Sequence, residues 1–137
     1  MRGSIIGAFA AAAWLGVVAI ASEKPTEIHV KRMQAQNDAV VDLRKNVEIK
    51  DWSAVARNAA SLKPLLKHTQ TFWEQRKVAD AVTLATSALK AVADIEASAK
   101  VKDEKGAIAG QRALNKACNS CHTAHREMTE DGKYMIK

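Results

Sequence analysis

The chain has 137 residues, a formal net charge of +6 and a hydrophobic fraction of 47%. This length is sufficient for one domain with one hydrophobic core. The charged residues are spread along the chain, and the basic excess is too small to indicate a nucleic-acid-binding protein. The composition therefore favours a single domain with a solvated, mildly basic surface.

The first 21 residues are predicted to be a secretory signal peptide. Arg2 supplies the positive start, an uncharged apolar run covers residues 5–21, and Ala19-Ile20-Ala21 forms an A-x-A cleavage signal. The run is short for a transmembrane helix, so cleavage after Ala21 is favoured over an uncleaved membrane anchor. The predicted mature domain is residues 22–137, which carries 20 basic and 15 acidic residues.

Helical periodicity runs through the mature domain, and no strand alternation or hairpin signal interrupts it. The expected helices cover roughly residues 25–46, a segment from 51 past 66, residues 74–100, and a segment from 103 onward. Each expected helix has one apolar face. The first face consists of Met33, Val40, Leu43 and Val47, and the second of Trp52, Val55, Ala59, Leu62 and Leu66. The third consists of Val78, Val82, Ala85, Leu89 and Val92, and the fourth of Ile108, Leu114, Cys118 and Cys121.

Helix ends can also be placed from the sequence. Asp51 and Asp103 are good N-cap residues for the second and fourth helices, and Pro25 suits a first helical turn. Pro64 is expected either to end or to kink the second helix, and Gly132 marks a turn in a short C-terminal tail. Four amphipathic helices with short connections predict an all-α, antiparallel four-helix bundle.

The most specific motif is Cys118-Asn119-Ser120-Cys121-His122. Cys-x-x-Cys-His is typical of covalent c-type haem attachment, in which both thiols form thioethers with the haem vinyl groups and the histidine binds iron. On a helix, Cys118 and Cys121 share a face and His122 lies one turn from Cys118. The motif uses the only two cysteines of the chain and predicts one covalently bound haem c.

Three other interpretations of the motif are open. A thioredoxin-like redox pair normally accompanies a βαβ pattern, and none is evident here. A zinc site could use Cys118, Cys121, His122 and His125, but ligands this close in sequence wrap poorly around a tetrahedral ion. A buried, inert cysteine pair is the third alternative. Haem attachment is favoured because the motif occurs together with an export signal.

This arrangement resembles the cytochrome c′ / cytochrome c-556 family, the class II c-type cytochromes. The resemblance rests on residues 118–126, Cys-Asn-Ser-Cys-His-Thr-Ala-His-Arg, in the last helix of a bundle that follows a signal peptide. The family commonly has an aromatic residue where His125 stands. Trp73 with Val78, Ala81 and Val82 looks like the family's start of the third helix. This chain is somewhat short for the family.

The resemblance implies a question about the sixth iron ligand. In the c-556 type, a methionine near the start of the first helix completes a low-spin site, and Met33 stands at that position. A core role for Met33 is the alternative, because methionine often fills gaps between helices. His29 would give a bis-histidine site instead. Arg126 is implied to lie near His122 or a haem propionate.

Other candidates rank lower. Met128 follows His122 too closely to reach the far face of a tethered haem, and nothing in the sequence requires Met135 to fold back. His68 is expected at the surface, and His125 is expected beside the proximal face without binding iron.

The leading hypothesis is a periplasmic c-type cytochrome that carries single electrons between redox partner proteins, with no enzymatic activity and no nucleic-acid partner. The alternative is a five-coordinate, cytochrome c′-like protein that binds NO or CO. A bundle with no cofactor is the third hypothesis. Membrane attachment is expected only if the signal segment stays uncleaved, and the resemblance leaves open a homodimer through the first helices.

Overall fold

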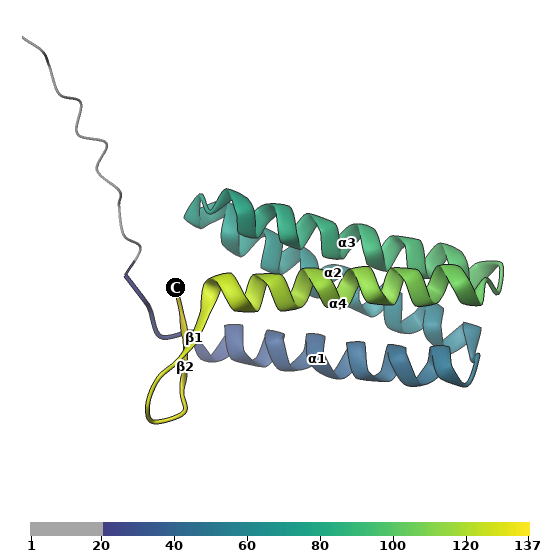
Figure 1. The fold of residues 1–137 in the computed structure, drawn as a ribbon, viewed down its shortest axis with the longest axis horizontal. Coiled ribbons are helices and arrows are strands. Elements are labelled where there is room, and N and C mark those ends of the chain that lie inside the picture. Colours follow the sequence, from purple (N-terminus) through teal and green to yellow (C-terminus); the bar gives the residue numbers. More distant parts are fainter. Residues whose placement is uncertain (1–20) are drawn as a thin grey trace, which may run out of the picture.

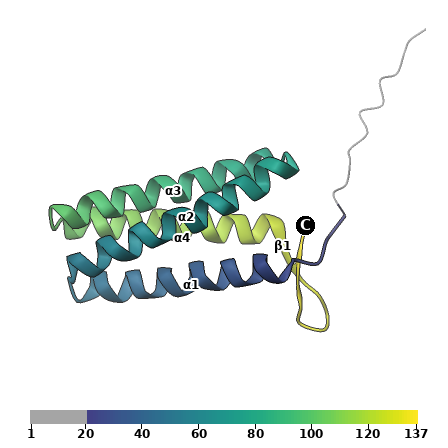
Figure 2. The ribbon, with the colours of Figure 1, turned by 180° about the vertical axis from the view of Figure 1, so that it is seen from behind.

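The computed structural model describes residues 21–137, so all of the predicted signal peptide except Ala21 lies outside the described residues. The elements that make up the bundle are four helices, α1 (Glu27–Glu48), α2 (Trp52–Arg76), α3 (Ala79–Lys100) and α4 (Glu104–His125). They lie side by side, and the short connections alternate between the two ends, so successive helices are antiparallel (Figures 1 and 2). The prediction of an all-α four-helix bundle is confirmed.

Three of the four helices begin at a residue whose side chain caps the first turn. Asp51 Oδ1 accepts a hydrogen bond from the Ala54 amide at 2.9 Å, and Asp103 Oδ1 accepts one from the Gly106 amide at 3.1 Å. Both predicted N-caps are therefore confirmed. Thr26 caps α1, so the helix begins two residues after Pro25.

The boundary between the second and third helices differs from the prediction. Trp73 lies in the last turn of α2, and α3 begins only at Ala79, so the expected start at residue 74 is wrong. The turn is made by Lys77, whose φ of 58° is left-handed. Left-handed backbone is usually supplied by glycine, and lysine gives no such signal in the sequence.

Pro64 neither ends nor begins a helix, since it lies inside the continuous α2. Proline removes the amide that would bond to the carbonyl of residue 60. Both Pro64 and Ala60 are exposed, so water can reach that carbonyl. The solvent-facing position explains how α2 tolerates the proline.

A small β-hairpin follows α4, which corrects the expectation that the chain has no strand. Strands β1 (Arg126–Met128) and β2 (Tyr134–Ile136) pair antiparallel, and Gly132 turns the chain between them with φ at 76°. Glu23 adds an isolated bridge to Ile136. Strands of three residues are too short to produce a recognisable alternation, although the turn at Gly132 was predicted.

Two groups of buried residues hold the bundle together. The larger one runs along the bundle and contains Leu43, Val55, Leu62, Val92, Ile95 and Leu114, each fully buried. The smaller one lies at the end nearest the hairpin and consists of Trp73, Val78, Ala81 and Ile136, with Cys121 packed against it. The smaller group thus joins the hairpin to the bundle beside the Cys-x-x-Cys-His motif.

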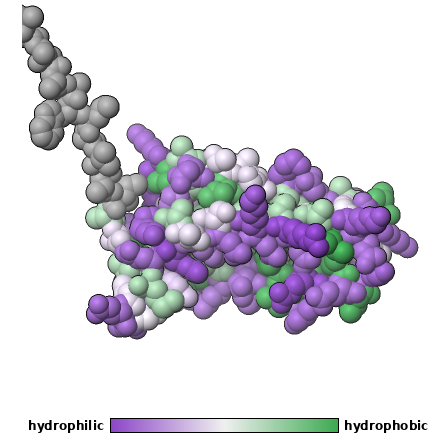
Figure 3. Space-filling view, viewed as in Figure 1, coloured by the Kyte–Doolittle hydropathy of each residue, from purple (hydrophilic) through white to green (hydrophobic). Residues whose placement is uncertain are grey.

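The surface is largely hydrophilic in the view of Figure 3, with hydrophobic patches at the end opposite the hairpin. Ile49 and Val101 are exposed there, in the α1–α2 and α3–α4 loops, which the Lys50–Glu104 ion pair joins at 2.7 Å. Within residues 21–137, no helix combines the length and apolar character that crossing a membrane would need.

Candidate cofactor site

A cavity of about 490 Å³ lies at the hairpin end of the bundle, between α1 and α4. Its position follows from how the helices pack. α4 packs mainly on α3 and α1 mainly on α2, whereas α1 and α4 touch only a little. The space between these two helices is the natural place for a ligand, and its volume lies in the range of small-molecule and cofactor pockets.

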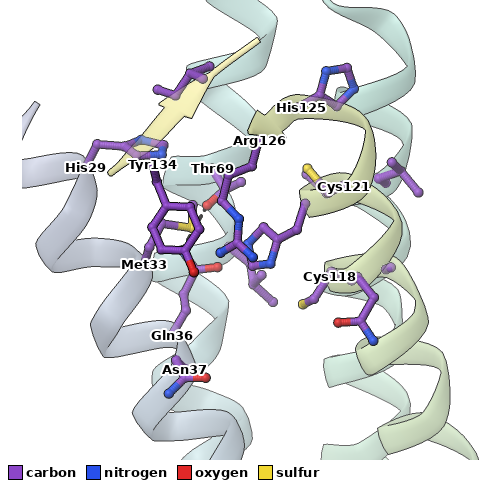
Figure 4. Close-up of a pocket in the computed structure, with 18 of the residues that line it drawn as sticks. His29, Met33, Gln36, Asn37, Thr69, Cys118, Cys121, His125, Arg126 and Tyr134 are labelled. Atoms are coloured by element: carbon purple, nitrogen blue, oxygen red, sulfur yellow. Dashed lines mark hydrogen bonds between the residues drawn. The ribbon is translucent and has the colours of Figure 1, made fainter. Parts of the chain in front are cut away.

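The three motif residues lie together on the α4 wall of this cavity. Cys118, Cys121 and His122 all line it, as the three- and four-residue spacing on one helix requires. Both cysteines are half-buried free thiols. In Figure 4 their sulfur atoms point from α4 into the space that separates it from α1.

Met33 lines the facing wall of the same cavity. It projects from α1 toward the side where Cys118 and Cys121 lie (Figure 4). The structure therefore brings Met33 into one cavity with the motif, although the two are far apart in sequence. His29, one turn earlier on α1, also lines the cavity and packs on Phe72, with the ring centroids 4.5 Å apart.

Burial shifts the titration of the groups in this cavity. It raises the pKa of the Cys118 thiol, and with the neighbouring Cys118 and Asp80 it raises the pKa of Cys121 to about 11. Burial also lowers the pKa of His122, and the positive charges of Arg126 and His29 add to this effect. At neutral pH the thiols are protonated and the imidazole is neutral, with a lone pair free to bind a metal.

Arg126 lies at the rim of the cavity, directly after α4. Its guanidinium stacks on the ring of Tyr134, 4.3 Å from the centroid, and both side chains line the cavity. Arg126 extends into the cavity near Tyr134 in Figure 4. The family resemblance implied that Arg126 lies near His122 or a haem propionate, and the charge of Arg126 lowers the pKa of His122.

His125 borders the cavity, but its ring is held in the joint between α2 and α3. Its Nε2 lies 2.8 Å from Asp80 Oδ2, and its ring centroid lies 4.9 Å from that of Trp73. Figure 4 shows the ring turned away from Cys118. Within residues 21–137, no three His, Cys, Asp or Glu side chains form a metal-binding group. The geometry therefore gives the zinc interpretation no support.

The remaining candidate residues differ in whether they line the cavity. Met128 is 62% exposed on β1, outside the cavity lining, and His68 is an exposed residue of α2. Met135 does line the cavity, because β2 pairs with β1 across the end of the bundle (Figure 1). No pattern in the sequence predicted that β2 would reach the cavity.

Sequence reasoning also missed a polar pair on the wall that carries Met33. Gln36 is the one buried polar residue among those described, and its Nε2 donates to Thr69 Oγ1 at 2.9 Å (Figure 4). Both residues line the cavity. Gln36 lies one turn after Met33, so the two residues share a face of α1. A polar residue on the same helix face as an apolar one was the only feature of the sequence that could have predicted its place in the cavity wall.

Comparison with models of known protein families, with curated protein sequences and with solved structures gave no match to this chain.

Proposed function

We propose that this protein is a c-type cytochrome that carries single electrons through one covalently attached haem, with His122 and Met33 as axial ligands. One observation carries the proposal: a single cavity has Cys118, Cys121 and His122 on one wall and Met33 on the facing wall. The donor set fits the group, since imidazole and thioether are haem ligands that favour electron transfer. The cavity supplies an apolar setting for a large ligand.

The two thiols attach the cofactor. Cys118 and Cys121 would hold haem through thioether bonds, each formed by addition of S–H across a vinyl group, which needs neither an oxidant nor a leaving group. Because burial raises the pKa of both thiols, the reactive thiolate form is disfavoured when the chain is folded. When bound, haem supplies a reversible one-electron iron couple, whose potential the protein sets through ligands, burial and hydrogen bonds.

Two residues close to the thiols have properties that suit haem binding. His122 is kept neutral by burial and by nearby positive charge, which is the protonation state that binds iron. Arg126 is placed at the rim, where its guanidinium can pair with a haem propionate while Tyr134 supports its position. These features support the resemblance to the cytochrome c′ / cytochrome c-556 family. Export to the periplasm and redox proteins as partners are proposed from the predicted signal peptide and from that resemblance.

The visible spectrum of the purified holoprotein tests this function. The reduced wild-type protein should give the sharp, split bands of low-spin haem and should react poorly with CO. Met33→Ala should become high-spin and bind CO readily, because the thioether ligand is lost. Met128→Ala, which changes an exposed methionine outside the cavity, should keep the wild-type spectrum.

A high-spin spectrum of the reduced wild-type protein would favour the five-coordinate alternative. If the wild-type spectrum is already high-spin and shifts with CO, the protein binds gases instead of serving as a His/Met electron carrier. If Met33→Ala keeps a low-spin spectrum, Met33 is removed from the site and His29 becomes the residue to test.

A further inference from the structure

The C-terminal residues 126–136 form a strap across the hairpin end of the bundle. This strap consists of β1, the turn at Gly132 and β2. From β2, Tyr134, Met135 and Ile136 all line the cavity. The strap is therefore one of the cavity walls, and Figure 1 shows it directly after α4, beside the start of α1.

The strap is fastened to the N-terminal segment by backbone hydrogen bonds. The Glu23 amide donates to the Ile136 carbonyl and the Ile136 amide donates to the Glu23 carbonyl, both at 2.8 Å. The Glu23 carboxylate is in turn paired with the guanidinium of Arg76, at the end of α2. The bridge thus connects the C-terminal strand, the N-terminal segment and the α2–α3 corner.

A single side chain anchors the strap to the core. Ile136 is only 8% exposed and packs with Trp73, Val78 and Ala81, while the other residues of the strap are largely exposed. Cys121 packs against this same group. Ile136 and Cys121 also line the same cavity, so detachment of Ile136 would loosen the packing around Cys121 and widen access to this part of the cavity.

We infer that the strap is an access-limiting wall, with Ile136 as the residue that keeps solvent and small exogenous ligands away from the Cys121 side of the cavity. The larger buried group contains no strap residue, so detachment of the strap would disturb only the smaller group, which includes Ile136. A short two-stranded hairpin is only marginally stable alone, so its position depends on the Ile136 anchor and the Glu23 bridge.

The first test uses thiol labelling and needs no haem. The full chain is purified without attached haem in a Cys118→Ser background, which leaves Cys121 as the only thiol. Ile136→Asn should increase the labelling rate of Cys121 about tenfold or more, because local opening becomes easier. Met128→Asn, an exposed change in the same strap, should leave the rate unchanged.

A second variant detaches the strap without altering the core. Glu23→Pro removes the amide that donates to Ile136, whereas Glu23→Gln keeps it and serves as the matched control. Glu23→Pro should raise the Cys121 labelling rate, and Glu23→Gln should raise it less. An unchanged rate in both Ile136→Asn and Glu23→Pro would overturn the inference.

The second test concerns small ligands and rests on the proposed function. In the reduced Met33→Ala holoprotein, where the sixth position is open, adding Ile136→Asn should accelerate CO binding about tenfold. Equal CO rates with and without Ile136→Asn would overturn the claim that the strap limits ligand entry. If the chain acquires no haem at all, the proposed function fails, and the thiol test still decides whether the strap closes the cavity.

Discussion

His125 and Asp80 form a contact that no pattern in the sequence predicted. Burial alone would raise the pKa of Asp80, but the hydrogen bond and charge of His125 outweigh it and hold that pKa below the usual value. The pair joins the last turn of α4 to the first turn of α3, next to Trp73. The pair involves the position at which the resembled family commonly has an aromatic residue.

The lowered pKa of Asp80 has a consequence for stability. A carboxyl group that is more acidic in the folded state stabilises that state above its unfolded pKa, and this stabilisation disappears as the pH falls through the folded pKa. The difference in unfolding free energy between wild type and Asp80→Asn should therefore be largest near neutral pH and should shrink toward about pH 3. Urea unfolding of the haem-free chain across this range measures it, and a pH-independent difference would contradict the explanation.

At the residue level, the sequence predicted the site residues on the α4 wall of the cavity and some of those on the α1 wall. Cys118, Cys121 and His122 are adjacent in the chain, so helical geometry alone places them together. Met33 was expected from a family resemblance, and the structure places it on the facing wall. Gln36 was missed because its burial depends on Thr69 in another helix, which is a tertiary contact without a local signal.

At the scale of the elements, all three loops between helices contain a lysine in left-handed conformation. Lys50, Lys77 and Lys102 have φ values of 58°, 58° and 55°. A β-carbon makes this conformation unfavourable by about 1–2 kcal/mol, which glycine avoids. The loops are therefore short and sharply turned without the glycine that normally marks such ends.

Lys102→Gly should stabilise the bundle by about 0.5–1 kcal/mol, because glycine relieves the left-handed strain and its greater freedom in the unfolded chain offsets part of the gain. Lys105→Gly is the matched control, since residue 105 lies inside the first turn of α4 and glycine there should destabilise the helix. Chemical denaturation of the haem-free proteins compares the two. Destabilisation by Lys102→Gly would show that the lysine side chain itself supports the loop.

The close packing of α3 and α4 depends on Gly110. A β-carbon at this buried position would lie 2.6 Å from Ile95 Cγ1 and 3.3 Å from the Ala91 carbonyl oxygen. Gly110→Ala should therefore destabilise the protein by about 1–3 kcal/mol, despite the better helix propensity of alanine. Because Ile95→Ala removes the Cγ1 atom that a β-carbon at position 110 would meet, Gly110→Ala should cost less in an Ile95→Ala background than in the wild type. Stabilisation by Gly110→Ala alone would contradict the packing described here.

Element boundaries were predictable where the capping residue is local and not where the turn is unusual. Asp51 and Asp103 cap their own helices, so the starts of α2 and α4 were predicted correctly. The start of α3 was misplaced at residue 74 because Lys77, and not a glycine, makes the turn after Arg76. The strands of the strap were missed because three residues are too few to show a strand pattern, and the bridge to Glu23 joins residues distant in sequence.

At the scale of the whole molecule, α1 is the helix most dependent on what occupies the cavity. It buries only Gln36, Leu43 and Val47, whereas α3 buries residues along its entire length. The first half of α1 also lines the cavity through His29 and Met33. A ligand held between α1 and α4 would therefore complete the packing of the bundle.

Hydrogen exchange tests this dependence. In the haem-free chain, amides in the first half of α1 should exchange faster than those of α3, and attached haem should slow them about tenfold or more. If Met33 binds the iron as proposed, Met33→Ala should reduce this protection, because α1 would no longer be bonded to the haem. Equal protection of α1 and α3 without haem would mean that α1 does not rely on the cavity.

The central claim is that Cys118 and Cys121 hold one haem covalently. Intact mass spectrometry under denaturing conditions tests it most directly, on the chain exported from cells that possess a haem-attachment system. We predict the mass of residues 22–137 plus one haem, and the unmodified mass when both cysteines are replaced by alanine. A wild-type chain that carries no added mass, or that releases its haem on denaturation, would contradict the claim.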